Sequence, residues 1–243
     1  TMKRYVAAIT LLLLATACDF SLGLPQAKTG PTETTTINIP APAGGALTAL
    51  TLEIGSADVQ ITGGGSVLVD GTVQTNVAEW KPVVTTSVGM VKIAQGKADS
   101  LLPDSVNTVN KWNLKLGKTP LNLTLNAGAY KGTLDLSGVA LRSLTIKQGA
   151  ATTDIIFNAP NPDVLKTLTI EAGASNLNFK GLGNANLETL SLLGGAGNFG
   201  FDFSGKLQRN ATVNLKSGVS NISLIVPEGV PATAKLSGAL RAA

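Results

Sequence analysis

The chain of 243 residues contains no histidine. Histidine supplies the base in Ser-His-Asp and Cys-His catalysis and is a common zinc ligand, so its absence excludes these catalytic classes and most zinc sites. A single cysteine, Cys18, excludes an intramolecular disulfide. Charged residues make up only 14% of the chain, 27 residues are glycine, and helical periodicity is hard to find beyond the N-terminal segment. Together these features favour an all-β protein.

The charge balance does not support a nucleic-acid partner. The chain has 19 basic and 15 acidic residues, and two of the basic ones, Lys3 and Arg4, belong to a segment that we expect to be removed. The remaining basic residues are scattered, whereas nucleic-acid-binding proteins gather them on one face. Glycine clusters at residues 63–65 and 194–197 lack the Lys-Ser/Thr pair of a phosphate-binding loop, so we interpret them as turns and expect no cofactor.

A six-residue repeat organises the rest of the chain. Each copy reads aliphatic, small polar, aliphatic, two free positions, glycine, and six copies occupy residues 50–55, 123–128, 144–149, 168–173, 190–195 and 213–218. A looser seventh copy occupies residues 91–96. From Gly128 onward the glycines are 21, 24, 22 and 23 residues apart. This spacing indicates a repeated structural unit.

The repeat predicts a strand that ends at a glycine corner. Its two aliphatic positions share one face of an extended chain, and glycine tolerates the positive φ that a sharp turn can require. A second alternating strand follows each corner, so one unit is strand, corner, strand and loop. Units stacked about 4.8 Å apart would share one core, which predicts a β-solenoid of two-strand coils. The predicted corners are Gly55, Gly128, Gly149, Gly173, Gly195 and Gly218.

Equivalent positions in neighbouring units predict contacts along the stack. Asn176, Asn198 and Asn221 each stand three residues after a corner glycine. They predict an asparagine ladder, although asparagine is also simply a favoured turn residue. Two further pairs are expected to interact, an ion pair between Lys147 and Glu171 and an aromatic stack between Phe179 and Phe201.

The N-terminal segment has the features of a bacterial lipoprotein leader. Lys3 and Arg4 precede an apolar stretch at residues 6–17, which is too short to span a bilayer because spanning takes about 20 residues. Small residues then lead into Cys18, which resembles a lipoprotein cleavage site. We expect residues 1–17 to be a signal peptide, Cys18 to carry lipid, and residues 18–33 to form a flexible tether. The alternative is an ordinary signal peptide with an unmodified thiol.

We expect residues 34–243 to form the solenoid. Residues 34–117 read as irregular coils with a loop from about residue 97 to 110, and residues 118–232 read as regular repeats. The chain stops shortly after residues 226–229, where a closing coil would be expected, so we expect a truncated C-terminal end.

The motifs at residues 50–59, 80–84, 112–117 and 134–138, followed by the serial repeats, resemble the bacterial toast-rack, adhesin-like families of unknown function. The resemblance covers about residues 34–232. It implies a β-helical rack outside the cytoplasmic membrane, in some members tied to the envelope stress response, and it implies no catalytic residue.

The acidic residues are not arranged as the catalytic carboxylates of polysaccharide-active β-helix enzymes would be. Asp135 and Asp202 would lie three coils apart, about 14 Å, which exceeds the 5 to 9.5 Å of glycosidase pairs. Asp135 and Asp154 lie on neighbouring coils, but no other catalytic group accompanies them. Trp80 and Trp112 could stack on sugars if exposed, and otherwise belong to the core. A threonine array of the ice-binding type would be interrupted by Lys147 and Glu171.

The leading hypothesis is therefore a non-enzymatic, lipid-anchored cell-envelope protein whose solenoid serves as an adhesion or protein-interaction scaffold. Its expected partners are the membrane, through lipid on Cys18, and envelope proteins or surface glycans. Two alternatives stay open, a sensing module in envelope stress signalling and a β-helix polysaccharide-active enzyme.

Overall fold

The computed structural model describes residues 28–97, 107–235 and 237. The expected signal peptide and Cys18 lie outside these residues. The described chain forms twelve strands: β1 (Glu33–Ile39), β2 (Thr48–Thr62), β3 (Val69–Thr75), β4 (Pro82–Ser87), β5 (Met90–Gln95), β6 (Asn110–Leu116), β7 (Leu121–Asp135), β8 (Leu141–Ile156), β9 (Leu165–Lys180), β10 (Leu187–Asp202), β11 (Thr212–Ser217) and β12 (Ser220–Ile225). Three short 3₁₀ helices complete it: η1 (Ala43–Gly45), η2 (Ala78–Trp80) and η3 (Leu182–Ala185). In these ranges no helix has the length and apolarity needed to cross a membrane.

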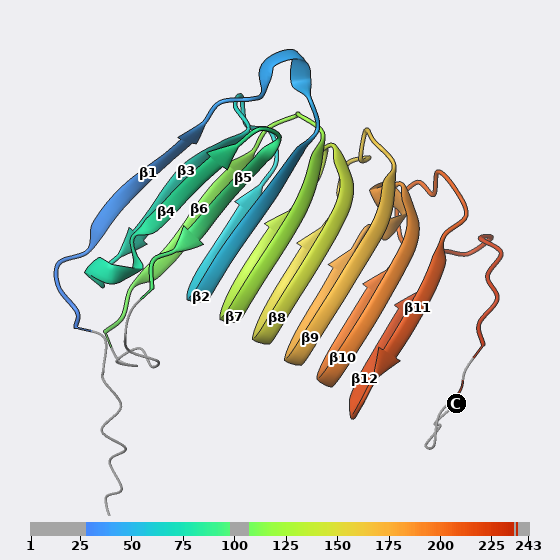
Figure 1. The fold of residues 1–243 in the computed structure, drawn as a ribbon. Coiled ribbons are helices and arrows are strands. Elements are labelled where there is room, and N and C mark those ends of the chain that lie inside the picture. The colour runs from blue at the N-terminus through green and yellow to red at the C-terminus, as the bar shows by residue number, and fades with distance from the viewer. Residues whose placement is uncertain (1–27, 98–106, 236, 238–243) are drawn as a thin grey trace, which may run out of the picture.

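Five long strands form the centre of the molecule and run parallel in the order β2, β7, β8, β9, β10 (Figure 1). Their registers place the first aliphatic position of each repeat directly over its equivalent in the next strand. The strands on either side of this group, β5 and β11, extend the same column. The column contains Val91, Leu50, Leu123, Leu144, Leu168, Leu190 and Val213. The predicted stacking of the repeats is therefore confirmed.

Each long strand folds back on itself at its corner glycine. In β9, Leu168 and Ile170 are buried before the corner, and Leu177 and Phe179 are buried after it. Buried and exposed residues alternate along each half of the strand. The alternation shifts by one residue at the corner, because Gly173 and Ala174 both face solvent. The halves of the strand thus present their apolar faces to each other, and Figure 1 shows the bend at the lower end of the rack. The structure confirms an all-β solenoid of two-strand coils.

The bend divides the molecule into two layers around a main core, and Val77 and Trp80 form a small separate cluster. The first layer is the sheet formed by β4, β5, β11 and the halves of the long strands before the corners. The second layer contains β1, β3, β6, β12 and the halves after the corners. A hydrogen bond of 2.9 Å from Tyr130 Oη to Gln148 Oε1 joins the layers just inside the corners.

The predicted reason for the corner glycines is wrong. None of the six predicted corners has a positive φ. Instead, a Cβ on Gly173 would lie 2.5 Å from the carbonyl oxygen of Gly149, and a Cβ on Gly149 would lie 2.8 Å from that of Gly128. Gly128, Gly195 and Gly218 meet the glycine oxygen of a neighbouring coil in the same way. Glycine is favoured because successive corners approach closely, and the space for a side chain is smallest at Gly173.

The order of coils in space differs from their order in the chain. β5 and β6 both pair with β2 on the side away from β7, so the looser seventh repeat lies before the first one. Its Gly96 contacts the backbone of Glu79 and not the other corners. The Gln95 side chain accepts a hydrogen bond from the backbone N–H of Gly55 at 3.0 Å. It occupies the place where the corner of a preceding coil would lie.

The fold begins slightly earlier than predicted. Gly30 donates its N–H to Asn76 O at 2.7 Å, and Glu33 opens β1 and pairs with Lys81 at 2.7 Å. The expected tether through residue 33 is therefore too long at its C-terminal side. At the other end, β11 and β12 form the last coil of the described chain, and the expectation of a truncated end stays a prediction.

The aromatic residues of the described chain are buried. Trp112 is fully buried and Trp80 is 5% exposed, which is inconsistent with sugar stacking by either indole. The rings of Phe179 and Phe201 stack with their centroids 5.5 Å apart, as predicted. The inward positions of the second layer thus continue the stacked core with larger side chains.

Candidate functional site

The two outer faces of the rack carry columns of mostly polar side chains, because every inward column of the coils is matched by an outward one. On the first layer, one column of aligned residues contains Thr85, Lys92, Thr51, Thr124, Thr145, Thr169, Ser191 and Asn214. Charged side chains accompany it, as predicted from the sequence. The Lys147–Glu171 ion pair is present at 2.9 Å, and Lys92 binds Glu53 at 2.7 Å.

The carboxylates considered for catalysis are each held by a local partner. Asp135 Oδ1 accepts the backbone N–H of Ser137 at 3.1 Å, and Asp202 Oδ1 accepts that of Ser204 at 2.8 Å. Asp154 Oδ1 accepts from Asn178 at 3.0 Å and lies 3.5 Å from Lys180 Nζ. The structure therefore gives these carboxylates roles in turns and in contacts between coils. In the described residues, no three acidic, cysteine or histidine side chains gather into a metal site.

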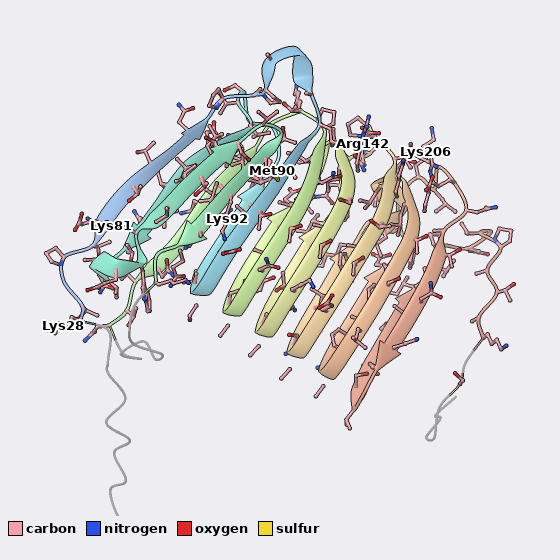
Figure 2. The ribbon with its side chains drawn as sticks, viewed as in Figure 1. Lys28, Lys81, Met90, Lys92, Arg142 and Lys206 are labelled. Carbon is pink, nitrogen blue, oxygen red and sulfur yellow. The ribbon has the colours of Figure 1, made fainter. Side chains whose placement is uncertain are left out.

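The loop end of the rack carries a second type of contact between coils. Arg142 Nε donates to Asp163 Oδ2 at 2.7 Å, and Arg209 binds Glu188 at 2.8 Å (Figure 2 labels Arg142). The hydrogen bond from Arg142 lowers the pKa of Asp163 below its usual value. Each pair joins a loop residue, Asp163 or Arg209, to the start of a strand in a neighbouring coil.

A groove of about 1000 Å³ follows the corners along several coils. We call it the corner groove. Its floor is the row of corner glycines, and its wall is formed by outward side chains before the corners, including Glu53, Asn126, Lys147 and Leu193. Because the glycines lack side chains, the groove is a direct consequence of their close stacking. It is shallow and open, which suits an extended chain better than a compact molecule.

The polar pair just inside the corners has a different character. Tyr130 and Gln148 are 6% and 5% exposed, and burial raises the pKa of Tyr130 to about 12. Within the described chain, Gln148 Nε2 has no hydrogen-bond partner. We assign this pair to the contact between the layers, because it lies inside the core.

The second layer contains a smaller hollow of about 270 Å³, walled by side-chain amides. Two outward columns form it. The first contains Thr152, Asn176, Asn198 and Asn221 in register, and the second contains Asp154, Asn178, Gly200 and Ser223. Gly200 leaves a gap in the second column between Asn178 and Ser223. We call this hollow the amide notch.

The amides around the notch are partly ordered by one another. Asn198 Nδ2 donates to Asn176 Oδ1 at 2.7 Å, which is the contact that an asparagine ladder requires. Asn221 continues the column in register, but no hydrogen bond links its side chain to Asn198 among the described contacts. The ladder bond leaves Asn198 Oδ1 and Asn176 Nδ2 available to a ligand. The sequence reasoning found these asparagines but missed the notch, whose only signal is a glycine within an alternating strand.

These observations define a class of protein, a two-layer β-solenoid with polar outer faces. A family model described as the N-terminal domain of toast_rack, a domain of unknown function, matches residues 28–163 and 160–225. These spans cover more than half of the chain. The chain therefore belongs to the toast-rack family.

One solved structure supports the architecture. The chain is similar to a candidate cell adhesion protein from Clostridium sporogenes, with 22% identity, a TM-score of 0.60, and coverage of 80% of this chain and 98% of that one. A candidate adhesin from Parabacteroides merdae shares 10% identity over 83% of this chain and 99% of its own, with a TM-score of 0.25. That score is too low to support a common fold, so only the first similarity bears on the architecture. A search of curated protein sequences found no match.

Proposed function

We propose that the protein is a non-enzymatic lipoprotein of the bacterial cell envelope, whose rack serves as an adhesion or protein-interaction scaffold. The observation that carries the proposal is the fixed register of the outer columns. Backbone pairing holds the polar side chains of five long strands at one constant spacing. A partner thus meets a preorganised surface and does not have to order it.

Binding is favoured over catalysis by what the carboxylates do. Asp135 and Asp202 each close a turn, and Asp154 joins two coils. A general acid and a nucleophile would instead need two carboxyl groups facing one substrate position. The similar fold from Clostridium sporogenes is described as that of a candidate cell adhesion protein, which agrees with the proposal.

The membrane anchor is proposed from Cys18 alone, since the small residues before it resemble a lipoprotein cleavage site. Lipid on this cysteine would hold the rack at the membrane, with the residues before Gly30 as the tether. A single acyl chain binds membranes only marginally, so stable anchoring requires the full lipoprotein modification.

The test uses the full chain in a bacterial host that processes lipoproteins, with Cys18→Ser as the matched variant. Labelling with a palmitate analogue should mark the wild-type chain and not the variant, and labelling that survives the substitution would remove the anchor. The same cells are then applied to arrays of glycans and envelope proteins. Wild-type cells should be retained on some array positions more than the variant cells. Retention equal to that of cells without the protein at every position would contradict the scaffold function.

A further inference from the structure

Gly200 differs from the corner glycines between β7 and β10 in what limits its side chain. A Cβ on a corner glycine such as Gly173 would collide with a backbone oxygen, and one on Gly132 would collide with the ring of Tyr130. At Gly200 the atom nearest to an added Cβ is the side-chain oxygen Oδ1 of Asn178 at 2.8 Å, and the first backbone atom is 3.9 Å away. Gly200 also lacks a positive φ. The backbone therefore does not require glycine at this position, and a larger residue would need only the Asn178 side chain to shift.

The effect of Gly200 is to open the amide notch. Glycine in the interior of a strand weakens the strand, because it costs conformational entropy and offers no side chain to pack. Gly200 lies within β10, whereas its neighbours in the column, Asn178 and Ser223, carry side chains. Asn178 Oδ1 lies next to the position that a side chain at Gly200 would take, and Asn198 and Asn221 also line the notch. A position that costs stability and leaves a polar hollow is best explained by a ligand.

We propose that the amide notch binds one neutral pyranose unit of a glycan. The inference rests on the proposed scaffold function and names a ligand class for it. A pyranose carries adjacent hydroxyl groups, and each can donate one hydrogen bond and accept others. Side-chain amides offer both functions, with Asn178 Oδ1 and Asn198 Oδ1 as acceptors and Asn176 Nδ2 as a donor. A volume of about 270 Å³ suits a single ring.

The charges around the notch favour a neutral sugar over an acidic one. Its one carboxylate, Asp154, is neutralised by Lys180 at 3.5 Å and accepts a hydrogen bond from Asn178. No positive side chain lines the hollow among the described residues. A sulfated or uronic sugar would therefore bury its charge without a partner, which is unfavourable.

The affinity of one such site should be low. The notch is open and offers hydrogen bonds but no aromatic ring, so we expect a Kd in the millimolar range. Useful adhesion would then come from many copies on one cell binding a polymeric glycan, since linked weak sites gain overall affinity.

The experiment follows the side-chain NH₂ signals of the asparagines by NMR in the full chain. Glucose, galactose, mannose and N-acetylglucosamine are titrated separately to the high millimolar range. With at least one sugar, the signals of Asn176, Asn178, Asn198 and Asn221 should shift together and saturate. Gly200→Val should abolish the shifts, because valine is well suited to a strand and fills the hollow. Thr133→Val, in the same column on β7 but outside the notch, is the matched control and should leave them unchanged.

A second variant separates loss of binding from loss of folding. Asn198→Ala keeps the backbone of β10 and removes one amide, so it should weaken binding at least several-fold while thermal unfolding stays near that of the wild type. The proposal is overturned if none of the four sugars shifts these signals, or if Gly200→Val leaves the shifts intact. If cells carrying the Gly200→Val variant still adhere to the arrays, adhesion depends on another part of the rack. Failure of this inference is therefore distinguishable from failure of the scaffold function.

Discussion

Replacement of a corner glycine by alanine should destabilise the protein in proportion to how closely its coil approaches the next one. The clearance of an added Cβ is 2.5 Å at Gly173, 2.8 Å at Gly149 and Gly195, and 3.0 Å at Gly218, each measured to a glycine carbonyl oxygen. Ordinary van der Waals contact begins at 3.4 Å. At Gly173 the two coils must therefore move apart by about 0.9 Å, and the contact atom is backbone, which cannot rotate away.

Two effects of opposite sign determine the magnitude. Alanine stiffens the unfolded chain, which alone would stabilise by about 0.4 to 1 kcal/mol. Overpacking against fixed atoms costs about 1 to 3 kcal/mol. We expect Gly173→Ala to lower the free energy of unfolding by about 2 to 2.5 kcal/mol and Gly218→Ala by less than about 1 kcal/mol. For a domain of this size the larger value corresponds to a fall in Tm of about 5 to 10 °C.

Denaturant titration and calorimetry of the variants at Gly173, Gly149 and Gly218 would measure this order. Gly138→Ala serves as the control, since Gly138 has a φ of 67° and nothing lies within 4 Å of its added Cβ. Its cost should come from the backbone conformation alone, about 1 to 2 kcal/mol. Equal losses at Gly173 and Gly218, or a reversed order, would refute close stacking as the reason for the corner glycines.

Three further predictions follow from contacts within the rack. Leu168→Ala, in the centre of the buried column, should cost about 2 to 5 kcal/mol in denaturant unfolding. Lys147→Ala should change stability by less than about 1 kcal/mol, because both members of its ion pair with Glu171 are about half exposed, and added salt should reduce even that difference. Tyr130 should stay protonated in the folded protein until about pH 12, as followed by ultraviolet absorbance. Its raised pKa contributes stability that is complete below pH 10 and is lost as the pH rises towards 12, and Tyr130→Phe should remove this dependence.

The sequence predicted those parts of the fold that follow from periodicity. The alternation around Leu144 and Leu168 predicts inward positions, and the constant spacing of the glycines predicts coils that stack in register. Register then implies the contacts between equivalent residues, which is why the Phe179–Phe201 stack could be predicted. These inferences succeed because a repeat imposes the same local geometry many times.

The parts that could not be predicted depend on approach distances and on pairing between distant segments. A glycine that avoids a neighbouring backbone looks the same in sequence as one with a positive φ, so the role of Gly173 was misassigned. The sequence could not predict that β5 and β6 pair with β2, because the order in which strands pair produces no periodic pattern in the sequence. The amide notch depends on one missing side chain, that of Gly200, and its meaning appears only when Asn178 and Ser223 are seen on either side.

The architecture itself restricts where recognition can reside. The inward columns are fixed by packing, and the corners are fixed by backbone contact, so neither can vary without loss of stability. Loops such as the one holding Asp163 are tied to neighbouring coils by ion pairs and hydrogen bonds. Only the outward columns are free to change, because a substitution there alters the surface while the register stays intact. Gly200 lies in an outward column, where a substitution leaves the register intact, so its place in β10 agrees with the proposed recognition at the amide notch.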